Sequence, residues 1–342
     1  MTKAPSVSVV IPTHQRRASV GLALQALAEQ TVPAETYEVI VSVDGSTDGT
    51  SELLADFDSP YALNTVAGPQ RGRAAACNAG VALARGDVLI ILDDDMQAEP
   101  ELVEHHRRHH PPGSRLCVLG AVPVEVDGTS PRAAHYVQAK FEAHLARLAH
   151  EDHLNLPRSF YSGNASLRAE VLREVGGFDD SFGSYGNEDV ELALRLGAAG
   201  VKLRYDPEAS ARQQYGKDLR GLARDTLAKG GTAVLLARSH PQTFDSLRLA
   251  EPRESSRPWL AVRSVLLWLS RRGGGVGTAI FAVAGLLECL GLWRQPLFYR
   301  AVLDYAFWAG VDAELSAATD GGDLARLAAE LHRGPIDLLL HR

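Results

Sequence analysis

Val88-Leu89-Ile90-Ile91-Leu92-Asp93-Asp94-Asp95 joins five apolar residues to three carboxylates. The apolar run is too short and too β-branched for a helix, so we predict a strand buried on both faces. Open α/β sheets bind their ligands just beyond the carboxyl ends of the strands, which is where the three aspartates fall. Their hard oxygen atoms suit Mg²⁺ or Mn²⁺, a metal that usually also holds substrate phosphates. The alternative is a solvated Asp-Asp-Asp turn.

The residues before this stretch alternate between strand and helix patterns. We predict strands at 7–11, 37–43, 61–66 and 88–92, and helices at 18–30, 47–57 and 73–84. Strands that alternate with helices of about a dozen residues are typical of a parallel sheet with helices on both faces. The fold class is therefore α/β, with a doubly wound, mostly parallel sheet.

Four polar clusters follow the four predicted strands. In a parallel sheet the carboxyl ends of neighbouring strands meet at one edge, so we expect these clusters to lie together. We call them the aspartate rim, and they comprise residues 12–17, 44–48, 68–73 and 93–95. Hydroxyl and carboxylate groups there can bind a base and a ribose, and arginines can bind phosphates. Individually the clusters are weak signals, because Ser46-Thr47-Asp48 is also a good helix N-cap and Gly72-Arg73 is also a turn.

A second candidate site is the stretch Gly183-Ser184-Tyr185-Gly186-Asn187-Glu188-Asp189, which precedes a predicted helix over 187–199. Carboxylates in a first helical turn are favoured by the helix dipole alone, which is the purely structural interpretation. The functional interpretation is a general base on a Gly-rich loop, with Tyr185 as an apolar platform for a substrate ring.

Other reactive side chains have ordinary explanations. The histidines pair at a spacing of four residues that can hold a metal, but no third ligand is apparent, and a solvated helix C-terminus is the favoured interpretation for His105, His106, His109 and His110. Cys77 follows a phosphate-binding candidate and could have a lowered pKa, but a small buried thiol is the default.

The totals exclude several classes. A chain of 342 residues with a net charge of −7 has no basic surplus for a phosphate backbone, which argues against nucleic acid as a partner. Three scattered cysteines suit a reducing cytoplasm rather than a disulfide framework. The first residues lack a basic segment followed by an apolar one, so we expect no signal peptide and a cytoplasmic location.

The second half of the chain is less regular. We predict a helix at 100–110, strands near 116–124, a helix at 131–150, a Gly-rich loop at 176–186, a short strand at 203–205 and a helix at 215–239 broken at Gly230-Gly231. From Pro258 the composition shifts, and residues 276–293 contain one charge, Glu288. This stretch is short for a membrane span of ~20 residues. We expect peripheral contact with the inner face of the cell membrane, or self-association, through residues 258–311 rather than a span; a buried helix is the remaining alternative.

The motifs resemble, in order and spacing, the signatures of family 2 glycosyltransferases with the GT-A fold. The resemblance covers roughly residues 6–215, and it rests on Val9-Val10-Ile11-Pro12-Thr13, Asp44-Gly45-Ser46-Thr47-Asp48-Gly49-Thr50, Ala75-Ala76-Cys77-Asn78-Ala79-Gly80, Leu92-Asp93-Asp94-Asp95, Gly163-Asn164-Ala165-Ser166, Gly176-Gly177-Phe178-Asp179 and Glu188-Asp189.

The resemblance implies transfer of a sugar, with inversion, from a nucleotide sugar to an acceptor hydroxyl. It implies Asp95 and Asp93 as ligands of Mn²⁺ or Mg²⁺ and Asp189 as the base that deprotonates the acceptor. Related retaining enzymes carry Asn at the position of Asp189. The implied acceptor contacts are Glu188, Tyr185 and Asn164. The implied nucleotide-sugar contacts are Pro12, Thr13, Arg17, Asp44, Arg71, Arg73, Asp93 and Asp94.

Two departures from the family pattern bear on these roles. Cys77 stands where an arginine often precedes the asparagine, so Arg71 or Arg73 would supply that charge. A histidine metal ligand common after the strand near residue 205 is not evident, and Gln213 and Gln214 occupy that neighbourhood. Weaker metal binding than in the relatives is the expected consequence.

The resemblance also implies the substrates and a division into parts. We expect a UDP-sugar donor, with dTDP and GDP as alternatives, and a hydroxyl acceptor such as a glycan or a lipid-linked sugar. The expected glycosyltransferase domain is 1–240, with a nucleotide-binding half 1–98 and an acceptor half 99–240, followed by a helical region 241–342. The competing functions are a nucleotide-sugar-binding protein that has lost catalysis and a haloacid-dehalogenase-like phosphatase, which places its Asp-x-Asp after the first strand instead of the fourth.

Overall fold

The computed structural model describes residues 5–150, 154, 156–250, 257–272, 275–290, 296–317 and 322–332. They form two compact units. The α/β unit comprises residues up to 129 together with 137–183 and 188–215, and the helical unit comprises 130–136, 184–187 and the chain from 216 onward. By packing, the boundary between the two units lies near residue 216, because the helix expected at 215–239 packs with the C-terminal helices; the domain boundary at 240 stays a prediction.

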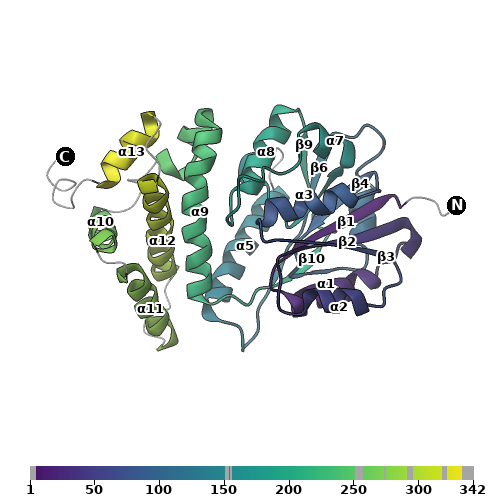
Figure 1. Ribbon diagram of the computed structural model, residues 1–342, viewed down its shortest axis with the longest axis horizontal. Helices are drawn as coiled ribbons and strands as arrows, with labels where there is room; N and C mark the ends of the chain where they lie inside the picture. The colour runs from purple at the N-terminus through teal and green to yellow at the C-terminus, as the bar shows by residue number, and fades with distance from the viewer. Residues whose placement is uncertain are drawn as a thin grey trace. The chain divides into compact units, whose positions relative to one another are not determined.

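A seven-stranded sheet forms the centre of the α/β unit (Figure 1). Its order is β3-β2-β1-β4-β8-β6-β9, in which the first four strands are parallel and β8 runs antiparallel to both of its neighbours. The strands are β1 Val7–Thr13, β2 Tyr37–Asp44, β3 Ala62–Gly68, β4 Val88–Leu92, β6 Leu116–Gly120, β8 Asn164–Arg168 and β9 Lys202–Asp206. The four predicted strands are confirmed within one or two residues, as is the mostly parallel α/β sheet.

A second sheet has three strands, one of which follows the aspartates directly in the sequence. Its order is β5-β10-β7, with strands Met96–Ala98, Ala211–Gln214 and Val124–Glu125. Strand β5 begins directly after Asp95, and β10 pairs with it antiparallel so that Gln213 stands opposite Met96. This pairing brings the end of the α/β unit back to the aspartate rim.

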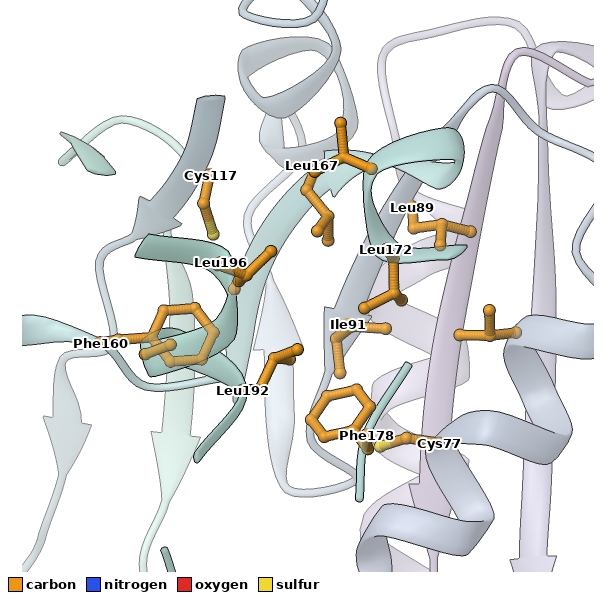
Figure 2. Close-up of a cluster of buried hydrophobic side chains, with 14 of the residues drawn as sticks. Cys77, Leu89, Ile91, Cys117, Phe160, Leu167, Leu172, Phe178, Leu192 and Leu196 are labelled. Carbon is orange, nitrogen blue, oxygen red and sulfur yellow. The ribbon is translucent and has the colours of Figure 1, made fainter. Parts of the chain in front are cut away.

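Helices cover both faces of the large sheet, and each face has its own core. The helices of this unit are α1 Arg17–Ala28, α2 Thr50–Asp56, α3 Arg73–Leu83, α4 Leu102–Arg107, α6 Leu156–Ser159, α7 Ala169–Glu174 and α8 Glu188–Ala198. Because side chains alternate along a strand, Val10 and Ile91 face α3, α7 and α8, whereas Val9 and Ile90 face α1, α2 and α4. Figure 2 shows the first of these cores, with Cys77 of α3 beside Phe178.

The helical unit is built around the crossing of two long helices. Helix α9, Leu219–Ser239, is continuous, so the predicted break at Gly230-Gly231 is wrong. A Cβ atom on Gly230 would lie 2.0 Å from the carbonyl oxygen of Phe307, and one on Gly310 would lie 1.9 Å from that of Leu227. The glycines therefore serve close packing of α9 on α12, Pro296–Ala317, rather than chain reversal.

The described residues of this unit also form α10 Arg257–Arg272, α11 Val276–Cys289, α13 Gly322–His332 and the short 3-10 helices η2 Pro241–Ser246 and η3 Arg248–Ala250. Their shared core contains Trp308, Tyr305 and Val311 of α12. Helix α5, Arg132–His150, begins in the helical unit and continues in the α/β unit. No helix among the described residues is both long enough and apolar enough to span a bilayer.

Candidate active site

The aspartate rim forms as predicted at the carboxyl ends of the parallel strands β1, β2, β3 and β4. Asp44, at the end of β2, accepts hydrogen bonds from the backbone N–H groups of Arg71 at 2.6 Å and Gly72 at 2.9 Å. This carboxylate therefore fixes the loop that carries the first residues of α3. The strand register and a buried acid together bring separate sequence motifs to one edge.

The second and third aspartates of the triplet are held by residues of β1, of the loop after it and of β10. Thr13 donates from Oγ1 to Asp94 Oδ2 at 2.7 Å. Arg16 lies with Nη1 3.2 Å from Asp95 Oδ2 and Nε 4.0 Å from Asp94 Oδ1. Gln213 donates from Nε2 to Asp95 Oδ1 at 3.3 Å. The side chain of Gln213 thus stands beside the carboxylate that the sequence assigns to the metal.

Arg73 connects the first aspartate to the second candidate site. It donates from Nε and Nη2 to Asp93 Oδ1, at 3.1 and 2.6 Å, and from Nη1 to Ser162 Oγ at 2.9 Å. The same Nη1 lies 3.7 Å from Glu188 Oε1. Because Glu188 opens α8, one guanidinium joins the end of β4 to the helix that carries Asp189.

Charge in this part of the α/β unit is unbalanced. The carboxylates of Asp93, Asp94, Asp95 and Glu188 face the guanidiniums of Arg16 and Arg73, which leaves two more negative than positive charges when all are ionised. Burial and the neighbouring aspartates raise the pKa of Asp94 to about 7, against the opposing effects of Arg16 and Thr13. A divalent cation would remove this imbalance.

The donor atoms fit Mn²⁺ or Mg²⁺. Asp93 and Asp95 offer hard carboxylate oxygens. Rotating the side-chain amide of Gln213 by 180° would exchange its nitrogen for its oxygen on the side of Asp95. Such ligands select hard cations over zinc or copper, which prefer nitrogen and sulfur. The predicted ligand pair therefore lies in a suitable setting, with Gln213 as a third candidate.

Glu188 and Asp189 lie in the first turn of α8, as predicted. Glu188 is buried, whereas Asp189 is partly exposed, and its Oδ1 accepts a hydrogen bond from the backbone N–H of Val190 at 2.8 Å. The second carboxylate oxygen of Asp189 remains for a hydroxyl proton, which is what a general base requires. Tyr185 belongs to the helical unit, where its 45 % exposed ring lies 5.2 and 5.1 Å from the ammonium groups of Lys217 and Lys229.

Asn164 takes a different place from the one predicted. Its side chain is fully buried, and its Nδ2 donates to the carbonyl oxygens of Ala121 and Ala209, at 3.0 and 2.9 Å. Its Oδ1 accepts from His106 Nε2 at 2.9 Å. Because every polar atom of this amide is bonded inside the unit, the structure argues against acceptor contact, and the assignment of Asn164 as acceptor-binding is withdrawn.

The interpretation of the histidines as a solvated helix end is wrong for two of them. His106 and His110 are buried, and each hydrogen-bonds Ser166 Oγ, at 2.7 Å from His106 Nδ1 and 2.8 Å from His110 Nε2. Since Asn164 Oδ1 only accepts, His106 carries its proton on Nε2 and accepts from Ser166, which in turn accepts from His110. Helix α4 also ends at Arg107 rather than 110, and the chain continues in turns.

The other two histidines lie in an ion-pair cluster. His109 Nε2 is 2.7 Å from Asp206 Oδ2, and His105 Nδ1 is 3.5 Å from Glu208 Oε2. Although His105, Asp206 and Glu208 could approach one ion, Arg108 Nη2 lies 2.9 and 3.0 Å from the two carboxylates and supplies the positive charge.

Among the arginines, the structure favours a neighbour of the predicted residue. Arg17 lies against α2, in a shallow cavity with Leu53 and Phe57, and its backbone N–H donates to Asp48 Oδ2 at 2.9 Å. It is Arg16 that reaches the aspartates. The sequence does not separate these two adjacent arginines, and Gln15, directly before them, has a left-handed backbone with a φ of 53°.

The other residues that the sequence singles out near the rim are Pro12, Arg71, Cys77 and Asn78. Pro12 is buried within β1, and Arg71 is largely exposed and pairs with Asp180 Oδ2 at 3.1 Å. Cys77 is fully buried, and burial raises its pKa to about 12, so the default of an inert thiol is confirmed. Asn78, which the sequence singled out only as part of a motif, bonds both N–H and C=O of Phe178 and so anchors the Gly-rich loop to α3.

Comparison with known proteins agrees with this geometry. Residues 8–176 match the family model described as glycosyl transferase family 2, and residues 143–215 match that of the N-terminal domain of galactosyltransferase. These matches place residues 8–176 of the chain in the family 2 glycosyltransferases. The phosphatase alternative fails, because the Asp-x-Asp motif follows β4 of a glycosyltransferase sheet.

Two sequence relatives and two solved structures illustrate the relationship. The validoxylamine A glucosyltransferase of Streptomyces hygroscopicus subsp. jinggangensis is 32 % identical over 230 residues, covering 60 % of this chain and 54 % of that protein. The pre-mycofactocin glycosyltransferase of Mycobacterium tuberculosis is 32 % identical over 177 residues, covering 50 % of this chain and 36 % of that protein. The chain thus spans about half or less of the length of these curated relatives.

Among solved structures, the mannosyltransferase PcManGT from Pyrobaculum calidifontis, in complex with GDP-Man and Mn²⁺, superposes with a TM-score of 0.60 at 21 % identity, over 93 % of this chain and 89 % of that one. GalNAc-T7 with UDP, GalNAc and Mn²⁺ gives a TM-score of 0.51 at 15 % identity, over 69 % of this chain and 48 % of that one. At these identities the likeness establishes the GT-A fold.

Proposed function

We propose that this glycosyltransferase moves a sugar from a nucleoside-diphosphate sugar to an acceptor hydroxyl, with inversion at the anomeric carbon, a divalent cation and Asp189 as general base. The observation that carries the proposal is the position of Arg73, which lies 2.6 Å from Asp93 and 3.7 Å from Glu188. It ties the carboxylates of the donor side to the start of α8, so that a donor sugar and a base can meet within one rigid unit.

The donor would bind along the aspartate rim. Thr13 and Asp44, at the ends of β1 and β2, are the proposed contacts of the base and ribose, and Arg16 and Arg73 provide two guanidiniums for phosphate oxygens. Asp95 and Asp93 would hold the cation, with Gln213 beside them. A bound Mn²⁺ or Mg²⁺ would supply charge neutralisation for the diphosphate as it leaves.

The chemical step is a single in-line displacement. The acceptor oxygen forms a bond to the anomeric carbon while the bond from that carbon to the diphosphate oxygen breaks, and Asp189 takes the acceptor's proton. Glu188 is the proposed acceptor contact of the α/β unit, and the contact predicted for Tyr185, which belongs to the helical unit, stays a prediction. Negative charge grows on the departing nucleoside diphosphate, where Arg16 and Arg73 are already oriented by the aspartates. We expect this stabilisation to exceed the contribution of the base, which is typically ~10²–10⁴-fold.

The family and its structural neighbours support the proposed class of donor. PcManGT was solved with GDP-Man and GalNAc-T7 with UDP, which supports a nucleoside-diphosphate sugar as the donor here. We propose a UDP-sugar first, with dTDP- and GDP-sugars as the alternatives. The acceptor is proposed to be the hydroxyl of a glycan or of a lipid-linked sugar, and the location to be cytoplasmic.

The test combines kinetics with stereochemistry. Asp189→Asn should lower kcat at least ~100-fold, because the amide cannot accept the proton, and should leave nucleotide binding unchanged. Asp56→Asn, an exposed carboxylate on α2, is the matched control and should retain activity. Proton NMR of the first product formed should show the anomeric configuration opposite to that of the donor. Full activity in Asp189→Asn, or a retained configuration, would refute the assignment.

The second candidate function is nucleotide-sugar binding without catalysis. The observation in its favour is Gln213 at the position beside Asp95, since an amide is a weaker metal ligand than the histidine of relatives. Measured turnover with any acceptor excludes it. Tight donor binding with neither transfer nor donor hydrolysis, across a panel of acceptors, would establish it instead.

A further inference from the structure

Helix α11 is arranged with its apolar side outward. Val283, Leu286 and Leu290, at the spacing of one helical face, are 55, 57 and 60 % exposed. The only charged residue of the helix, Glu288, is 6 % exposed and accepts a hydrogen bond from Tyr299 at 2.7 Å. A helix on the surface of a protein in water normally has the opposite arrangement.

Helix α10 repeats this arrangement. Val262, Val265 and Leu269 share one face and are 47, 39 and 38 % exposed. Arg263, in contrast, is 3 % exposed and donates to Asp304 Oδ2 at 2.8 Å. The helical unit thus buries ionic groups on the inner side of both helices and leaves aliphatic groups outside.

The two helices form one surface. They contact each other, and α10 packs on α12 while α11 packs on the start of α9. Figure 1 shows α10 on the side of α12 away from α9, with α11 next to it. We define the outer patch as the exposed side chains of this surface: Val262, Val265, Leu269, Val283, Leu286, Leu290 and the 72 % exposed Leu297. Contiguous apolar patches of this kind mark interaction surfaces.

The exposed charged side chains close to the outer patch in sequence are arginines. Within the described parts of residues 258–300, the exposed charged side chains are Arg271, Arg272 and Arg300, and the single carboxylate, Glu288, is buried. Arg271 is ion-paired with Asp312 at 2.8 Å, so Arg272 and Arg300 carry the local positive charge, in a chain of net charge −7. Apolar groups bordered by arginines complement a bilayer surface that carries anionic lipids.

We propose that the outer patch docks the protein in the plane of an anionic membrane. Helix α11 has 14 residues, and at ~1.5 Å per residue it is shorter than the ~30 Å hydrocarbon core. The helices therefore lie in the interface instead of crossing it. A second copy of this chain is the less suitable occupant, because pairing two such patches brings arginines of like charge together. This proposal is independent of the proposed chemistry.

The test uses vesicle flotation of the full chain. Vesicles of phosphatidylcholine with 30 % phosphatidylglycerol should carry the protein, and pure phosphatidylcholine vesicles should carry at least ~10-fold less, as should the anionic vesicles at high salt. Leu286→Glu with Leu290→Glu should lower partitioning at least ~10-fold. Leu83→Glu, at a 44 % exposed leucine of α3, is the matched control and should partition like the parent chain.

A second readout uses the cysteines. Cys289 is exposed on α11, whereas Cys77 and Cys117 are buried, so a polarity-sensitive fluorophore should label Cys289 alone. Its emission should shift to the blue when anionic vesicles are added. Circular dichroism confirms folding of the variants, and unchanged nucleotide binding in them separates a failure of docking from a failure of the proposed chemistry.

Three results would overturn the proposal. The first is the absence of binding to anionic vesicles, and the second is equal partitioning of the double variant and the parent. The third is a dimer in sedimentation that Leu286→Glu dissociates, with no blue shift on vesicles, which would make a second copy the occupant of the outer patch.

Discussion

Acidification should destabilise the α/β unit through the buried pair His106 and His110. Burial lowers the pKa of His106 to about 4 and that of His110 to about 3, from 6.5 for an exposed imidazole. The folded state therefore holds both rings neutral, and their full contribution to stability is present above pH 6.5. Below that pH the unfolded chain binds protons at these histidines and the folded chain does not. The free energy of unfolding therefore decreases as the pH is lowered, until the folded pKa values are reached.

The magnitude follows from proton counting. Each ring that is charged only in the unfolded state contributes a slope of ~1.4 kcal/mol per pH unit, so the pair gives about 2.7 kcal/mol per unit. Between pH 6.5, where the unfolded rings are half protonated, and pH 5 the loss is about 3 kcal/mol, a large share of the 5–15 kcal/mol that stabilises a typical domain. Protonation of both rings would also leave Ser166 Oγ facing two N–H donors at 2.7 and 2.8 Å.

The assay must report on the α/β unit by itself. All four tryptophans, Trp259, Trp268, Trp293 and Trp308, follow residue 216, so their fluorescence reports on the helical unit. Hydrogen exchange of peptides from β4 and β8, measured by mass spectrometry between pH 7 and pH 5 and corrected for intrinsic rates, isolates the sheet. Protection there should decrease along the predicted slope.

Substitution identifies the group responsible. His106→Gln should be less stable at pH 7, because a bond to Asn164 is weakened, and should have about half the slope of the parent between pH 6.5 and 5. His150→Gln, at an exposed histidine of α5, should keep the parent slope. An unchanged slope in His106→Gln would refute the reasoning about this pair.

Three further predictions concern single contacts. Arg16→Gln removes the cation that lies 3.2 Å from Asp95, so Mn²⁺ alone should bind about tenfold more tightly in titration calorimetry. The control, Arg107→Gln at an exposed arginine, should leave the affinity for Mn²⁺ unchanged. Weaker Mn²⁺ binding in Arg16→Gln would show that Arg16 does not compete with the metal. Gly163→Ala places a Cβ atom 2.5 Å from Asp93 Oδ2 and should weaken nucleotide binding at least ~10-fold. Gly128→Ala, with open space around it, should leave the affinity unchanged. Equal nucleotide affinities of the two variants would contradict this. Gly230→Ala should lower the free energy of unfolding by ~1–3 kcal/mol or more in urea, monitored by tryptophan fluorescence, because α9 and α12 must separate. Gly216→Ala is the control. A change near zero in Gly230→Ala would show that the two helices adjust freely.

The sequence predicted the part of the fold that depends on local patterns. The apolar run before Asp93 and the three strands before it have the length, composition and turn residues of parallel strands, and all four appear. Because parallel strands deliver their carboxyl ends to one edge, the aspartate rim followed from topology alone.

The errors share a physical cause, which is that tertiary packing decides what a polar or small residue does. In the sequence Gly230 predicts a break in the helix, whereas in the structure its missing side chain lets α9 approach the backbone of α12. Asn164 lies in a motif that suggests substrate contact, yet its side-chain amide is hydrogen-bonded to two backbone carbonyls and to a histidine. Arg16 and Arg17 are adjacent, and the left-handed turn at Gln15 before them has no signal in the sequence.

The central claim is that the aspartate rim binds a nucleoside diphosphate together with a metal. The most direct measurement is the thermal stability of the full chain with UDP, GDP, dTDP, ADP and CMP, each with Mn²⁺ or with a chelator. A ligand at about 100 times its Kd should add ~2.7 kcal/mol of stability. We predict stabilisation by one nucleoside diphosphate, dependent on Mn²⁺ and lost in Asp95→Ala. Unchanged stability with every nucleotide would contradict the assignment of the rim as a donor site.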